Sequence, residues 1–111
     1  MQYKLTLYGP EVAYVNEPVV FHGELRKLTK NWEPVEGAKI YLLINDEIVA
    51  DTETLREGYY EFTWTFKEPG RYKVQTSTTA KPPAKIPWGI IAAGAALAGL
   101  SLIVLARARK R

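Results

Sequence analysis

His22 is the only histidine among the 111 residues, and the chain contains no cysteine. An imidazole is the side chain best suited to act as a general base or a metal ligand near neutral pH. The alternation in "VVFHGEL" places His22 on the outward side of a predicted strand, between Val20 and Glu24. Ser77 lies at a strand end and Ser101 lies in an apolar run, so the pattern assembles no Ser/His/Asp triad. We therefore expect a solvated surface histidine and a protein that is not an enzyme.

Five carboxylates within a short stretch raise the question of a cation site: Asp46, Glu47, Asp51, Glu53 and Glu57. Calcium loops need oxygen ligands that curl round one ion at DxDxDG-like spacing. Here Asp51 and Glu53 fall on one face of a predicted strand, and that spacing does not occur. The absence of cysteine also excludes a thiolate nucleophile and a cysteine-based metal site. We interpret the carboxylates as a solvated acidic face and expect neither a metal nor a cofactor.

Charge is unevenly distributed along the chain. Residues 1–80 hold nine Lys/Arg and twelve Asp/Glu, whereas residues 81–111 hold six basic residues and no acidic one. A domain that binds nucleic acid needs a basic face to neutralise phosphates, so the acidic first part argues against nucleic acid as a partner. About 80 residues suffice for one small domain with a single core.

Residues 1–80 show a series of short segments in which apolar and polar side chains alternate. The strongest is "YYEFTWTF", whose large aromatic side chains share one face: Tyr60, Phe62, Trp64 and Phe66. "AKIYLLI" and "EIVADTE" flank Asn45-Asp46, a pair that tolerates positive φ and predicts a tight hairpin. Because no helical pattern separates these segments, the sequence predicts an all-β antiparallel sandwich.

Four motifs in a fixed order resemble the immunoglobulin-like and transthyretin-like β-sandwich repeats of prokaryotic surface proteins: "FHGEL", "EPVEGAKIYLLI", "GYYEFTWTF" and "EPGRYKVQT". The resemblance covers about residues 10–78. It implies an immunoglobulin-like sandwich of about six to seven strands that acts as a spacer, stalk or docking surface and has no active site. It also implies that Tyr72 pins the turn before the penultimate strand. Since "KPPAK" follows Thr79 almost directly, we expect the final edge strand to be missing, short or supplied by a partner.

The run of 21 residues from 86 to 106 contains no charged side chain. A helix of that length spans roughly 30 Å, which is the thickness of a bilayer hydrocarbon core. Trp88 suits one membrane interface, and four basic residues suit the other: Arg107, Arg109, Lys110 and Arg111. We therefore predict a sandwich at 1–80, a Pro-rich lead-in at 81–85, a transmembrane helix at 86–106 and a basic tail at 107–111.

The predicted span also suggests an orientation and a packing face. Two lysines precede it and four basic residues follow it, which favours a cytoplasmic C-terminus and an extracytoplasmic sandwich at the cell membrane. A tail anchor with the opposite orientation is the alternative. Small residues lie four apart within the span, as Gly94 with Ala98 and Ala95 with Gly99. This spacing fits self-association of helices, and a plain anchor fits it equally well.

Both faces of the segment "AKIYLLI" are apolar. One face serves the core, which leaves Tyr41 and Leu43 outward, beside Val20, as a candidate protein contact. We therefore expect a single-pass membrane-anchored sandwich module that acts as a structural or protein-docking accessory subunit. Its expected partners are membrane lipid and another membrane or surface protein. The alternative is a structural membrane protein of a virus or surface layer, packed in many copies.

Overall fold

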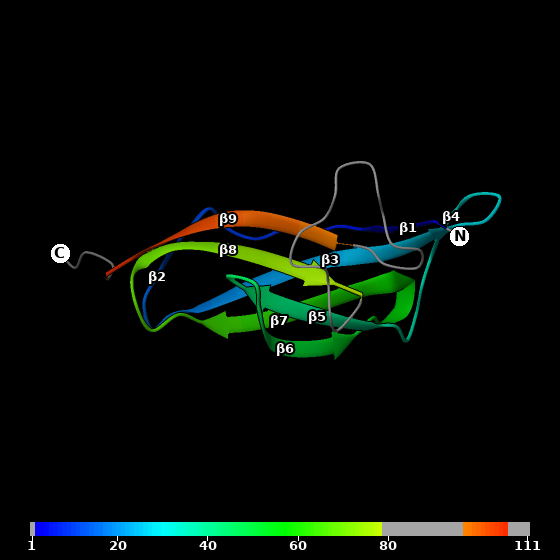
Figure 1. Ribbon diagram of the computed structural model, residues 1–111. Coiled ribbons are helices and arrows are strands. Elements are labelled where there is room, and N and C mark those ends of the chain that lie inside the picture. The colour runs from blue at the N-terminus through cyan, green and yellow to red at the C-terminus, as the bar shows by residue number, and fades with distance from the viewer. Residues whose placement is uncertain (1, 79–96, 107–111) are drawn as a thin grey trace.

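Two β-sheets face each other in the computed structural model, which describes residues 2–78 and 97–106 (Figure 1). In the first sheet, β3 (Pro18–Leu28) pairs antiparallel with β1 (Gln2–Leu5), β4 (Trp32–Pro34) and β7 (Tyr59–Thr65). A short 3₁₀ turn, Arg56–Gly58, leads into β7. The second sheet has the order β2, β9, β8, β5, β6. These strands span Val12–Tyr14, Leu97–Leu105, Gly70–Ser77, Lys39–Ile44 and Glu47–Glu53.

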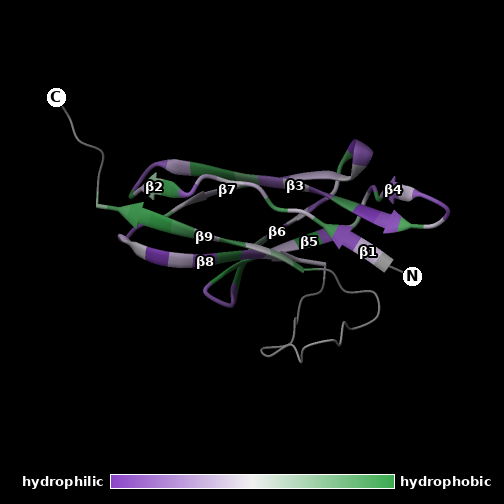
Figure 2. Ribbon diagram, turned by 90° about the horizontal axis from the view of Figure 1, so that it is seen from above, coloured by the Kyte–Doolittle hydropathy of each residue, from purple (hydrophilic) through white to green (hydrophobic). Residues whose placement is uncertain are grey.

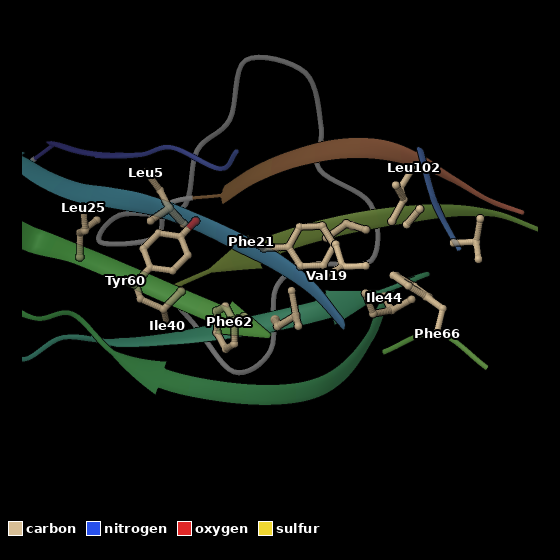
Figure 3. Close-up of a cluster of buried hydrophobic side chains, with 14 residues drawn as sticks. Leu5, Val19, Phe21, Leu25, Ile40, Ile44, Tyr60, Phe62, Phe66 and Leu102 are labelled. Carbon is tan, nitrogen blue, oxygen red and sulfur yellow. The ribbon is translucent and has the colours of Figure 1, made fainter. Parts of the chain in front are cut away.

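Side chains that alternate along the strands fill the space between the sheets. Phe21 of β3, Tyr60 of β7 and Leu42 of β5 are 0% exposed, and Leu102 of β9 is equally buried. Figure 3 shows Phe21, Tyr60 and Leu102 projecting into one layer from different strands. The aromatic row predicted in "YYEFTWTF" forms part of this core, with Trp64 only partly buried at its margin.

Two predicted turns are present. Asn45 and Asp46 have φ values of 51° and 73°, and they connect β5 to β6 in an antiparallel hairpin. The Tyr72 hydroxyl donates a hydrogen bond of 2.8 Å to the Glu68 carbonyl, four residues upstream. This bond ties β8 to the turn that precedes it, which is the role that the resemblance implied for Tyr72.

The prediction of a transmembrane helix is wrong for its C-terminal part, because Leu97–Leu105 form strand β9. This strand pairs antiparallel with β8 and parallel with β2. Its inward side chains include Leu102 and Val104, which are 0% and 2% exposed. The outward side chains are largely uncharged and apolar as well, so the strand looks uniformly hydrophobic along its later residues (Figure 2). An apolar run of this kind does not reveal by composition whether it is strand or helix.

No helix within residues 2–78 and 97–106 is long and apolar enough to cross a membrane. Residues 86–96 of the predicted span, the lead-in at 81–85 and the basic tail at 107–111 lie outside the described residues.

The final strand of the sandwich is therefore present, and it comes from the segment that the sequence assigned to the membrane. The sandwich extends past the predicted boundary at residue 80 to include β9. The described residues form nine strands instead of six to seven, because β9 and the three-residue strands β2 and β4 were not expected. The parallel β2–β9 pair is the one departure from antiparallel pairing among them.

Candidate functional site

The two edges of β9 are paired to different extents. One edge pairs with β8 from Leu97 to Val104. The other edge pairs with β2 only at its end, from Ile103 to Leu105. There the Ile103 N–H donates to the Glu11 carbonyl at 3.0 Å, and the Val15 N–H donates to the Leu105 carbonyl at 3.1 Å. The backbone groups of Ile103 and Leu105 therefore point away from β8.

Backbone groups alternate in direction along a strand, and this alternation fixes where the groups of the earlier β9 residues point. In a strand, the N–H and C=O of every second residue point to the same edge. The groups of Leu97, Gly99 and Ser101 consequently point to the same edge as those of Ile103. No strand within residues 2–78 and 97–106 pairs with this part, which we term the free β9 edge: the backbone N–H and C=O groups of Leu97, Gly99 and Ser101.

The free β9 edge lacks three features that commonly protect a sheet edge, namely a charged side chain, a proline and a β-bulge. Natural edge strands are commonly blocked by lysine, proline or a β-bulge. Leu97, Gly99 and Ser101 are uncharged, and the β8–β9 register runs without a shift. Such an edge is a template for pairing with another strand.

A hollow of about 500 Å³ adjoins this edge, where the chain crosses from the first sheet to the second. Gly9 passes so close to the core that a Cβ atom would lie 2.6 Å from Phe21 Cδ1 and 3.6 Å from Leu100 Cδ2. Only a residue without a side chain allows this passage. The hollow is lined by Leu7, Tyr8, Gly9, Pro10, Glu11, Arg71, Leu100, Ser101 and Ile103. It therefore combines apolar side chains with one acidic and one basic residue.

On the outer face of the first sheet, His22 lies between two tyrosine rings. The ring centroids of Tyr8 and Tyr59 are 5.6 Å and 6.1 Å from that of His22. The Tyr59 hydroxyl donates to Glu61 Oε1 at 2.8 Å, and this hydrogen bond raises the pKa of Tyr59. His22 thus points outward, as the alternation predicts, within an aromatic row. The described residues contain no group of three or more His, Cys, Asp or Glu side chains that could hold a metal ion.

The structure does not bring the predicted contact patch together. Tyr41 is partly exposed on β5 in the second sheet, whereas Val20, 44% exposed, lies on β3 in the first sheet. Leu43 is only 3% exposed. The regular pairing with β8 sets Leu43 opposite Gln75, on the outward face that alternation predicts, but Leu43 is buried there and lies outside the core cluster.

The other predicted site residues have separate outcomes. Ala98 and Gly99 are consecutive in β9, where their side-chain positions face opposite sides of the sheet. They do not share a helix-packing face there. Gly94, Ala95, Trp88, Arg107, Arg109, Lys110 and Arg111 lie outside the described residues.

The sequence did not point to the free β9 edge, because the uncharged run predicted a helix in this segment. One signal was available: Gly99 and Ser101 are spaced two apart and alternate with Ala98, Leu100 and Leu102. This period of two is typical of a strand with one buried face.

No protein-family model matches the chain, and no curated protein matches it. Among solved structures, it is similar to the CARDB domain of the PF1109 protein from Pyrococcus furiosus in complex with di-metal ions, with a TM-score of 0.65 and 15% identity. That match covers 96% of this chain and 94% of the other. A solution NMR structure of the same CARDB domain gives a TM-score of 0.62 and 17% identity, covering 93% and 94% of the two chains. At this identity the similarity shows the fold alone, an all-β immunoglobulin-like sandwich.

Proposed function

We propose that this protein is a non-catalytic immunoglobulin-like module that docks another protein by accepting an extended strand on the free β9 edge. The observation that carries the proposal is the half of β9 at Leu97, Gly99 and Ser101, which is uncharged, free of bulges and unpaired by any strand within residues 2–78 and 97–106. Strand addition uses the main-chain donors and acceptors of such an edge for affinity. Specificity then comes from pockets that receive alternate side chains of the added strand.

The hollow beside the edge provides such a pocket. Its apolar side chains include Leu7, Leu100 and Ile103, and Glu11 and Arg71 also line it. A docked strand with an aliphatic residue next to charged residues would match this lining, because apolar burial supplies affinity and charges select the register.

A docking role fits the chemistry of the described residues better than catalysis does. His22 is placed between tyrosine rings, and its cross-strand neighbour Glu61 already accepts a hydrogen bond from Tyr59. The similar CARDB domain was solved with di-metal ions. The described part of this chain offers no comparable group of three acidic, histidine or cysteine ligands, so a metal has no place in the proposal.

The membrane and cell-surface location stays a prediction from the sequence, as does the alternative of a structural protein of a virus or surface layer. The docking role rests on Leu97–Leu105 as a strand paired with β2 and β8, and it does not depend on that location.

Panning a library of displayed peptides against the full chain tests the proposal. Ser101→Pro removes the N–H that points to the free edge and leaves the hydrogen bonds to β8 in place, since edge strands tolerate proline at such positions. Ser101→Ala is the matched control, because it keeps the N–H. Selected peptides should bind the parent and Ser101→Ala and should lose binding to Ser101→Pro. Peptides that bind Ser101→Pro as well as the parent, and lose binding to Tyr41→Ser, would place the contact on β5 and refute the proposal.

A further inference from the structure

We infer that the strand accepted by the free β9 edge is β9 of a second copy of this chain, paired antiparallel about a twofold axis at Gly99. The inference rests on the docking function proposed above and names its partner.

The position of the axis follows from the pairing of β9. Beyond Ser101, β2 already occupies the edge from Ile103 onward. The groups that no described strand pairs belong to Leu97, Gly99 and Ser101, which are symmetric about Gly99. In a twofold pair, Leu97 therefore faces Ser101 of the second copy, and Gly99 faces its own equivalent. Each free N–H then meets a free C=O of the other copy, which is the antiparallel hydrogen-bonding pattern.

The residue on the axis permits self-pairing. A side chain at a twofold axis faces an identical side chain, and like charges directly opposite one another destabilise a sheet. Gly99 has neither charge nor side chain, and its flanking residues, Leu97 and Ser101, are uncharged too. An isologous contact of this type needs only one surface, which every copy of the chain presents.

Charges on the neighbouring strand do not prevent this pairing. On the outward face of β8, Arg71 and Lys73 lie one strand away from the contact, opposite Ile103 and Ser101. The Lys73 ammonium is 2.8 Å from the Asp46 carboxylate, which offsets its charge. The second sheets of the two copies would then form one continuous sheet through β9.

A charge exchange at Gly99 tests the twofold axis directly. A Cβ atom at this position would lie 3.3 Å from Gln75 Cγ, the flexible part of an outward side chain, and 3.4 Å from the Val74 carbonyl oxygen. Gly99→Glu and Gly99→Lys are therefore expected to fold. We expect the parent chain to sediment as a dimer and each variant alone to sediment as a monomer, because like charges meet at the axis. An equimolar mixture of the two variants should regain the dimer.

A parent chain that remains monomeric at the concentrations used for NMR would overturn the inference, as would Gly99→Glu and Gly99→Lys chains that dimerise alone or remain monomeric when mixed. If both variants lose their cooperative melt, Ser101→Pro and Ser101→Ala replace them, with the dimer expected only for Ser101→Ala. A dimer formed by both Ser101 variants, or by neither of them, overturns the inference. A monomeric parent whose selected peptides still lose binding to Ser101→Pro overturns the second copy as partner and leaves the docking function standing. A monomeric parent with no such peptides overturns both.

Discussion

Replacing Leu102 by alanine should strongly destabilise the protein if β9 belongs to the sandwich. Leu102 is 0% exposed and lies in the same buried cluster as Phe21 and Val74. Removing a fully buried leucine side chain beyond Cβ leaves a cavity and costs about 2–5 kcal/mol. The total stability of an ordinary domain is only about 5–15 kcal/mol, so the midpoint of urea unfolding should fall clearly. Tryptophan fluorescence of the full chain measures that midpoint.

The adjacent residue provides the control. Ile103 points outward and is 39% exposed, so Ile103→Ala should cost no more than about 1 kcal/mol, the span of β-propensity effects. A segment that lay outside the sandwich would make the two aliphatic side chains nearly equivalent for domain stability. Equal losses for Leu102→Ala and Ile103→Ala, or no loss for either, would therefore refute the placement of β9 in the core.

Three further results are expected. Burial raises the pKa of Tyr60 from 10.0 to about 12. The neutral phenol therefore contributes its full stability below pH 10, and up to about 3 kcal/mol of the unfolding free energy is lost as the pH rises from 10 to 12. This loss should be absent in Tyr60→Phe when the unfolding free energy is measured against pH. Gly23→Ala should prevent cooperative folding, because its Cβ would lie 1.9 Å from the Thr6 carbonyl oxygen, whereas Gly99→Ala should melt like the parent; similar melts for both would contradict the close contact. In a monomeric Gly99→Glu chain, amide exchange followed by NMR should be slow at Leu102 and fast at Ser101, and equal rates would exclude an open edge.

The first sheet and most of the core follow from alternation that is visible in the sequence. Val19, Phe21 and Leu25 share one face of β3 and are buried, whereas the opposite face carries His22 and Glu24 beside the exposed Val20. The Asn45-Asp46 hairpin follows equally well, because few residue pairs adopt positive φ at low cost. Local sequence patterns were sufficient to predict a strand and its buried face wherever the other face of that strand is polar.

The free β9 edge was not predicted in this way, because the alternation in the first half of β9 does not continue into its second half. Ile103 and Leu105 point outward and are apolar, so the period of two is hidden in the later half of β9. The pairing of β9 with β2 joins segments about 90 residues apart in the chain, and no local pattern specifies such a contact. The length of the uncharged run then favoured a span, although tertiary pairing places its second half in a sheet.

The predicted contact patch does not form for reasons that alternation cannot show. Alternation places Leu43 outward with Tyr41, and the pairing of Leu43 with Gln75 agrees with this, yet Leu43 is only 3% exposed. Val20 lies in the other sheet. Alternation along one strand assigns a face to a side chain, but it specifies neither what covers that face nor which strands lie beside it.

A cross-strand disulfide between β8 and β9 tests most directly whether β9 completes the sandwich in the observed register. Gln75 and Gly99 are paired across the two strands on the outward face, and their backbone groups point away from each other, which gives a short Cα separation of about 4.5 Å. The native chain has no cysteine, so the chain with both Gln75→Cys and Gly99→Cys contains only this pair. Under mild oxidation it should form an intramolecular disulfide and become harder to unfold, whereas Gln75→Cys with Leu100→Cys, offset by one residue, should not. Failure of the Gln75/Gly99 pair to close, or equal closure of the offset pair, would contradict the placement of β9 beside β8.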